Sequence, residues 1–269
     1  MTTQLSVYAD PQAEAAGAVS AVVASLPLSF GPGASAADVT AVAGHAGWTD
    51  RASAAIRSGA KGVVVSAPVA EDPAGLTAVA DAAGSVVVLD LQWAGNLALD
   101  STSENVHGAI AAALEDALLL DSVAIAVPGT DPLHLLTDQL AVLVQCGIEV
   151  RNVRMVQRNG NGYTVSGVIA DGIPVALQGI LTSALPATAS LTVLTSTGRT
   201  DVVLPDPAAA WPAEVRSVTT EGAMTLPTLY ESSHRTSWSR VHSHISSGTP
   251  AHDLARFSAV MSLLSQLTS

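Results

Sequence analysis

The stretch Ala52–Val69 reads ASAAIRSGAKGVVVSAPV and decides how the first part of this chain folds. Thr49–Ser58 predicts a helix, because a capping threonine begins it and Gly59 ends it. The run Gly62–Ser66 is apolar without alternation and stops before Pro68, which predicts a strand buried on both faces. A helix followed by such a strand is typical of a parallel sheet that helices cover on both sides.

The segments around this stretch repeat the same alternation. An alanine-rich segment that follows Pro11 and runs to Leu26 favours helix, and Glu71–Ala83 predicts a further helix. The expected strands of this part are Leu5–Ala9, Leu28–Phe30, Val39–Ala43, Gly62–Ser66 and Val86–Leu91. We therefore expect residues 1–100 to form an α/β domain with a parallel sheet.

Beyond a polar stretch at residues 96–103, the pattern changes to closely spaced strands. Helices are expected at Glu104–Leu119 and Pro132–Cys146, and a last one from about Ala251 to Leu267. The expected strands are Val123–Val127, Val150–Gln157, Tyr163–Ala170, Pro174–Leu181, Ser190–Thr195 and Thr200–Leu204. Short connections require antiparallel pairing, so residues 101–269 predict an α+β domain with an open, mostly antiparallel sheet.

Composition and charge argue against several classes of protein. The 269 residues are 48% hydrophobic and 13% charged, which predicts a folded chain. A formal charge of −12 and no basic stripe argue against nucleic acid and anionic membranes as partners. The single cysteine excludes an internal disulfide, and no signal peptide or membrane span is apparent. We expect a cytoplasmic protein.

Several motifs, in this order, resemble those of the glucose-fructose oxidoreductase and inositol dehydrogenase (Gfo/Idh/MocA) family. In that family a helix, a glycine and an apolar strand lead to Glu-Lys-Pro, as Ala52–Val69 leads here to Ser-Ala-Pro. GTDPLHLLTDQL at Gly129–Leu140 is similar to the family's Asp-x-x-x-His-x-x-Asp helix, and DGIPVALQG and the tail SSGTPAHDLARFSAVMSLLSQL also match. The resemblance covers residues 38–269. It implies a Rossmann-like domain that holds NAD(P), then a second domain whose open sheet pairs between subunits.

Two departures from the family pattern concern the cofactor and the catalytic lysine. Where the family has Gly-x-Gly-x-x-Gly, this chain has YADPQAE at Tyr8–Glu14, with a proline that lacks an N–H and two carboxylates where a pyrophosphate would sit. Ala67 replaces the lysine that aids proton transfer in the family, and Lys61, the only lysine, lies at the far end of the same strand. We therefore expect NAD(P) binding and hydride transfer to be weakened or lost, so that no cofactor is bound.

Candidate catalytic residues lie on the helix that opens the second domain. Asp131, His134 and Asp138 are spaced by three and four residues and so share a face. A histidine beside a carboxylate can act as a general base, because its pKa lies near neutrality. The alternative, which we favour, is structural: Asp131 caps the helix and His134 is a surface or interface residue.

Other polar and aromatic residues are candidates for binding. Trp93 and Asn96 follow the strand Val86–Leu91, and we expect them to contact substrate, because ligands of such folds bind at the carboxyl ends of strands. His234, His242 and His244 fall in a Ser/Thr-rich segment that we expect to be a connection, so no metal site is predicted.

Three functions remain open. The first is a degenerate relative of sugar and polyol dehydrogenases that acts in ligand binding, in regulation or as the partner of an intact paralogue. The second is an active NAD(P)-dependent oxidoreductase on a sugar, polyol or related small molecule, with His134 or Asp131 in the acid–base role. The third is a non-redox lyase or isomerase in the same cleft. Homo-oligomers are expected, because an uncovered face of the apolar strands in Val150–Leu204 would favour association.

Overall fold

The computed structural model describes residues 4–100, 103–206, 209 and 211–267 and divides into two compact units. The first unit is Met1–Gly95 with Ser233–Met261, and the second is Asn96–Ser232 with Ser262–Ser269. The chain thus returns to the first unit after most of the second is complete. The sequence does not predict this return.

The first unit contains a five-stranded, fully parallel sheet in the order β2-β1-β3-β4-β5. Its strands are β1 (Leu5–Ala9), β2 (Phe30–Pro32), β3 (Val39–Ala43), β4 (Gly62–Ser66) and β5 (Val86–Asp90). β4 and β5 are buried along their whole lengths, as expected of unalternating apolar strands that are covered on both faces. The expected parallel sheet is confirmed, although β2 begins at Phe30 rather than Leu28, whose side chain is exposed.

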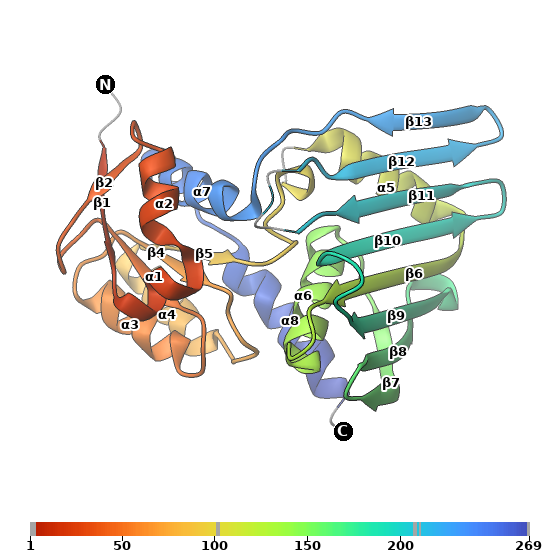
Figure 1. Ribbon diagram of the computed structural model, residues 1–269, viewed down its shortest axis with the longest axis horizontal. Helices are drawn as coiled ribbons and strands as arrows, with labels where there is room; N and C mark the ends of the chain where they lie inside the picture. Colours follow the sequence, from red (N-terminus) through yellow and green to blue (C-terminus); the bar gives the residue numbers. More distant parts are fainter. Residues whose placement is uncertain (1–3, 101–102, 207–208, 210, 268–269) are drawn as a thin grey trace. The chain divides into compact units, whose positions relative to one another are not determined.

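Helices cover both faces of this sheet (Figure 1). They are α1 (Pro11–Gly17), α2 (Val19–Ser25) and α7 (Ser233–Ser247) on one face, and α3 (Trp48–Arg57), α4 (Ala74–Ala83) and the start of α8 (Asp253–Gln266) on the other. On the first face, Trp238 of α7 packs with Val64 and Val88. On the second, Phe257 of α8 meets the Trp48 ring edge-on.

The second unit contains an eight-stranded sheet in the order β13-β12-β11-β10-β6-β9-β8-β7. Its strands are β6 (Ala117–Ala126), β7 (Arg151–Asn159), β8 (Gly162–Val168), β9 (Pro174–Leu181), β10 (Thr188–Thr195), β11 (Arg199–Leu204), β12 (Glu214–Thr219) and β13 (Gly222–Leu226). Neighbouring strands are antiparallel except β6 and β9, which are parallel. The expected mostly antiparallel sheet is confirmed.

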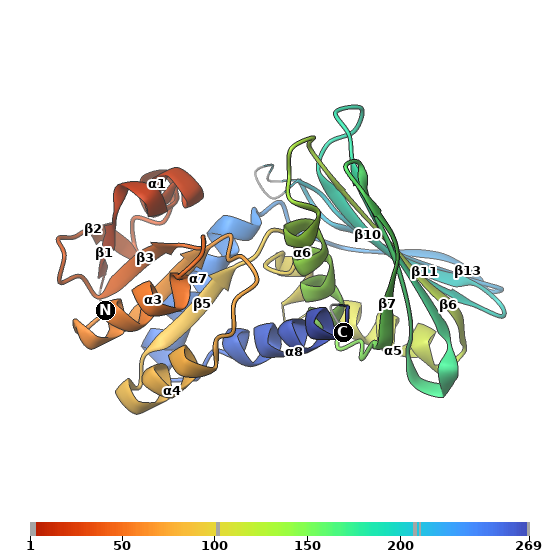
Figure 2. The same cartoon turned by 90° about the horizontal axis from the view of Figure 1, so that it is seen from below.

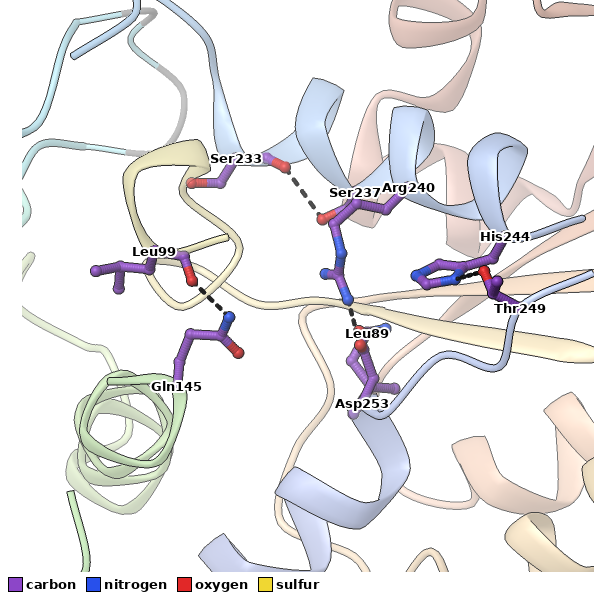
Figure 3. Close-up of polar contacts among 9 residues, drawn as sticks. All are labelled: Leu89, Leu99, Gln145, Ser233, Ser237, Arg240, His244, Thr249 and Asp253. Carbon is purple, nitrogen blue, oxygen red and sulfur yellow. Dashed lines mark hydrogen bonds and ion pairs between the residues drawn. The ribbon is translucent and has the colours of Figure 1, made fainter. Parts of the chain in front are cut away.

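Two helices cover one face of this sheet (Figure 2). α5 (Glu104–Glu115) packs on β10 and β11, and α6 (Pro132–Gln145) packs on β6 and β9. Along β6, buried residues alternate with half-exposed ones, which is the pattern of a sheet with one covered face. The end of α6 is held by Gln145, whose side-chain amide donates to the Leu99 carbonyl at 2.7 Å in the short 3-10 helix Leu97–Leu99 (Figure 3).

Two elements of the second unit correct the expectations from sequence. The helix expected to reach Leu119 ends at Glu115, and residues 117–126 form the central strand β6. The leucines at 118–120 are compatible with a helix and with a strand. They form a strand here because they pair with β9 and β10. The hairpin of β12 and β13 is not predicted, because its largely exposed residues lack an alternating apolar pattern.

α7 corrects the expectation that its segment is an irregular connection. Its serines and histidines are weak helix formers, but Trp238 and Val241 are fully buried against the sheet, so tertiary packing sets the helix. Arg240 of α7 pairs with Asp253, whose other carboxylate oxygen accepts the Leu89 N–H at 2.9 Å (Figure 3). These contacts cover the edge strand β5 and fix α7 beside it.

Candidate functional site

The turn between β1 and α1 is where Rossmann-like sheets hold a dinucleotide pyrophosphate. Here Asp10 caps the helix: its Oδ1 accepts the Ala13 N–H at 2.7 Å, and Pro11 begins the helix without an N–H. The Glu14 carboxylate accepts the N–H and the hydroxyl of Ser20, at 2.9 and 3.0 Å. The Asp10 carboxylate therefore occupies this turn, whereas that of Glu14 lies at the start of α2, and the residues of the turn do not fit a pyrophosphate.

A groove of about 790 Å³ lies beside this turn, between β1, β2, α1 and α2. Val7, Val19 and Phe30 are among the residues of its largely apolar wall. Among the described residues that line it, Glu14 is the only charged one. Such a groove suits a neutral or positively charged molecule with an apolar body better than one that carries phosphates.

The position of the family's catalytic lysine is occupied by Ala67, directly after β4. Its backbone is left-handed, with a φ of 49°, and its N–H donates to the Asp90 carbonyl at 3.1 Å. Gly44 permits this tight path, because a Cβ there would lie 2.4 Å from the backbone that follows Ala67. Lys61 lies at the opposite end of β4, where its ammonium contacts Asp38 at 2.8 Å. It therefore cannot replace the missing lysine.

Asp90 and His234 form a close pair at the carboxyl edge of the same sheet. Asp90 ends β5 with a fully buried side chain, and its Oδ2 lies 2.6 Å from His234 Nδ1 on α7. Ser66 ends β4 in register with Asp90, so both side chains point to the face that α7 covers. Sequence reasoning misses this pair, because the two residues are 144 positions apart and α7 itself is not predicted.

Three buried polar atoms at this edge have no hydrogen-bond partner within the part of the chain that the structure describes. They are Ser66 Oγ, Asp90 Oδ1 and Trp93 Nε1. A buried group without a partner costs about 1–3 kcal/mol, so such groups are rare and call for an explanation. Ligand binding is one explanation, and the carboxyl end of a parallel sheet is where it is expected.

On α6, the structure brings together two of the three candidate catalytic residues. His134 Nε2 lies 3.5 Å from Asp138 Oδ2, with Asp138 buried and the His134 side chain 24% exposed. Asp131 instead caps the helix, since its carboxylate accepts the Leu133 N–H at 2.9 Å and lies 3.8 Å from Arg158. This arrangement places the His134 imidazole beside the Asp138 carboxylate and gives Asp131 a capping role.

A buried polar chain lies beside Asp138 and is not evident from the sequence. The Tyr163 hydroxyl donates to Gln139 Oε1 at 2.8 Å, and the Gln139 amide donates to the Ser122 hydroxyl at 2.9 Å. Burial raises the pKa of Tyr163 well above its usual value, and the charge of Asp138 adds to this effect. The phenol therefore stays protonated and joins β8 to α6.

Trp93 and Asn96, the predicted substrate-binding residues, are both buried. Trp93 is 1% exposed, and the Asn96 side chain accepts a backbone N–H of the Leu97–Leu99 helix at 3.0 Å.

No three His, Cys, Asp or Glu residues are grouped to hold a metal ion anywhere in the described ranges. His244 lies on α7 rather than in a connection, and its Nδ1 is 3.1 Å from the Thr249 hydroxyl (Figure 3). No described helix is long and apolar enough to span a membrane.

Comparison with known proteins reveals likeness in structure alone. No protein-family model and no curated protein matches the chain. KijD10, a 3-ketoreductase from Actinomadura kijaniata solved with NADP, matches with a TM-score of 0.68 at 17% identity, over 99% of this chain and 88% of that one. The UDP-N-acetylglucosamine 3-dehydrogenase GnnA from Acidithiobacillus ferrooxidans matches with 0.65 at 13% identity, over 99% and 97%.

A more distant match is the dehydrogenase MviM from Clostridium difficile, with a TM-score of 0.56 at 7% identity, over 91% of this chain and 84% of that one. These neighbours are of the Gfo/Idh/MocA type that the sequence resembles. At such low identity the likeness establishes the fold and not the activity. The chain therefore has the two-part fold of these dehydrogenases and of this ketoreductase.

Proposed function

We propose that this chain is a small-molecule-binding relative of the sugar and polyol dehydrogenases that works without tightly bound NAD(P). The observation that carries the proposal is the Asp10 cap on α1, which uses the N–H of Ala13. A second anion at this place would meet the Asp10 carboxylate. The apolar groove beside the turn supports the proposal, because its described lining offers no lysine or arginine to a phosphate.

Titration of the protein with NADPH and NADH by calorimetry tests this function. We expect dissociation constants weaker than about 100 µM for both, and a value in the low micromolar range would overturn the proposal. A variant with Asp10→Gly and Pro11→Gly restores flexibility to the turn. We expect it to bind no more tightly, because the groove still lacks a cation for the phosphates.

A second function, an NAD(P)-dependent oxidoreductase on a sugar or related small molecule, is favoured by the likeness to KijD10, which was solved with NADP. The comparisons favour this second function, whereas the residues of the turn favour the first. The acid–base role would fall to His134, paired with Asp138 at 3.5 Å.

Assaying sugars and polyols with added NAD(P) tests this second function. If it holds, wild type turns over and His134→Ala lowers the rate by about 10² to 10⁴. If His134 is structural, any rate present changes by less than about threefold, well below the contribution of a general acid or base.

A further inference from the structure

We propose that the groove between β1, β2, α1 and α2 binds a small organic cation, a primary amine on an aromatic body. Glu14 holds the ammonium group, and the apolar wall of the groove covers the ring. The inference rests on the proposed function, because a protein that works without tightly bound NAD(P) needs a ligand of another class, and it names that class.

The groove has the size and the lining of a small-molecule site. It lies at the β2-β1 edge of the first sheet (Figure 1), and its volume is about 790 Å³. Pockets that hold small molecules occupy roughly 300–1,000 Å³. Val7, Val19 and Phe30 line the groove and also belong to the buried core of this unit. An aromatic ring that enters the groove therefore leaves water for an apolar surface, which favours binding.

The wall around Phe30 is fixed by packing and by hydrogen bonds. The Phe30 ring meets the Trp238 ring edge-on, with 5.4 Å between their centroids, and it lies 5.6 Å from the His242 ring. The Gln4 side-chain amide donates to the carbonyls of Pro27 and Phe30, at 2.7 and 2.8 Å. These contacts form the wall before any ligand arrives, so binding does not have to order it.

The polar atoms of the lining accept hydrogen bonds more readily than they donate them. Three of the lining residues, Pro11, Pro27 and Pro32, have no N–H. The Ser20 N–H and hydroxyl both donate to the Glu14 carboxylate, at 2.9 and 3.0 Å. A carboxylate has further lone pairs, so Glu14 can also accept from a ligand. A ligand that donates hydrogen bonds therefore fits the groove best.

Charge selects a cation among such donors. Glu14 is the only charged residue among the described residues that line the groove, and the whole chain carries a formal charge of −12. An ammonium group is attracted by both, whereas a phosphate is repelled by both. The apolar wall excludes water from one side of the contact, which strengthens the attraction between the ammonium and the carboxylate.

Three indole compounds that share one ring system and differ in charge test the inference. At pH 7 tryptamine is a cation, tryptophol is neutral and indole-3-propionate is an anion. Ligand-observed NMR titrations of the full chain give the three dissociation constants. We expect a Kd below about 1 mM for tryptamine, a value at least about fivefold weaker for tryptophol, and a still weaker one for indole-3-propionate.

Two charge variants separate Glu14 from the net charge of the chain. Glu14→Gln should weaken tryptamine binding by about fivefold or more and leave tryptophol within about twofold. Asp50→Asn, at an exposed position of α3 outside the groove, should leave both compounds unchanged. Each substitution removes one negative charge, so a difference between the two variants reports contact of the ligand with Glu14.

Salt gives a readout that needs no variant. Raising NaCl from about 0.05 M to about 0.5 M should weaken tryptamine binding to wild type, because the ions screen its contact with the carboxylate. Tryptophol binding should stay within about twofold, because an uncharged ligand has no such contact to lose.

Two bulky substitutions on α2 place the ligand in the groove. Ala24 and Ala21 are both exposed, and Ala24 lines the groove whereas Ala21 does not. Ala24→Phe should weaken tryptamine binding by about tenfold or more, because the ring takes up space that the ligand needs. Ala21→Phe, with the same added bulk on the same helix, should bind tryptamine like wild type.

Absence of tryptamine binding, or equal affinity for all three indole compounds, would overturn the inference. So would tryptamine binding that neither Glu14→Gln nor salt weakens, or an equal loss in Ala24→Phe and Ala21→Phe. Tight NADPH binding would instead overturn the proposed function. The two failures are distinguishable, because the indole titrations contain no nucleotide.

Discussion

The Asp10 carboxylate accepts the Ala13 N–H at 2.7 Å, so the helix that would face a cofactor is capped by the chain itself. A side-chain cap and a bound phosphate compete for the same backbone N–H groups. The cap is also an anion, and it repels a second anion nearby. Under the proposed function, this one residue both stabilises α1 and disfavours nucleotide binding.

Replacing Asp10 with alanine removes this cap. We expect the free energy of unfolding to fall by about 1 kcal/mol, which for a chain of this length lowers Tm by about 2–4 °C. Scanning calorimetry of Asp10→Ala beside Asp81→Ala, an exposed position in α4, measures the effect. An unchanged Tm for Asp10→Ala would show that the cap does not form.

The first sheet was open to prediction because its signal is local. β1, β3 and β4 coincide with the apolar runs that predict them, since strands covered on both faces need no alternation. The helix α7 is not predictable in this way, because its residues are poor helix formers. Burial of Trp238 outweighs them, and that burial depends on distant parts of the chain. The same reason hides the Asp90–His234 pair, whereas the shared face of His134 and Asp138 follows from spacing alone.

Asp38 should make the stability depend on pH. The Lys61 ammonium, with the hydroxyl and N–H of Ser6, holds the pKa of Asp38 well below its usual range. The folded pKa lies below the unfolded value of about 4, so the stabilisation is complete above that value and is lost as the pH falls toward the folded pKa.

Urea denaturation of wild type and Asp38→Asn at several pH values checks this dependence. We expect wild type to be more stable by about 1.5–3 kcal/mol near neutral pH, the range for hydrogen bonds to charged groups, and the difference to shrink below about pH 4. Lys61→Met removes the strongest donor and should weaken the pH dependence. A difference that does not change with pH would contradict the role of Asp38.

The uncovered face of the second sheet should mediate self-association. Ile125 of β6 and Ile180 of β9 lie in register, and Ile180 is 40% exposed. Light scattering should give at least twice the chain mass of 27.1 kDa for wild type, and Ile180→Glu should give a monomer. Leu28→Glu, exposed in the first unit, should leave the oligomer intact. A wild-type monomer at high concentration would contradict the association.

The left-handed backbone at Ala67 predicts that replacement by glycine stabilises the protein, whereas the same replacement at an alanine in a helix destabilises it. A residue with a Cβ is strained at a φ of 49°, and glycine is not, so Ala67→Gly should raise the free energy of unfolding by about 0.5–1 kcal/mol. Ala54→Gly, at an exposed position within α3, should lower it by about 1 kcal/mol, because glycine disfavours helix. Urea denaturation of the two variants measures both effects. If both substitutions destabilise the protein, residue 67 does not adopt the left-handed conformation.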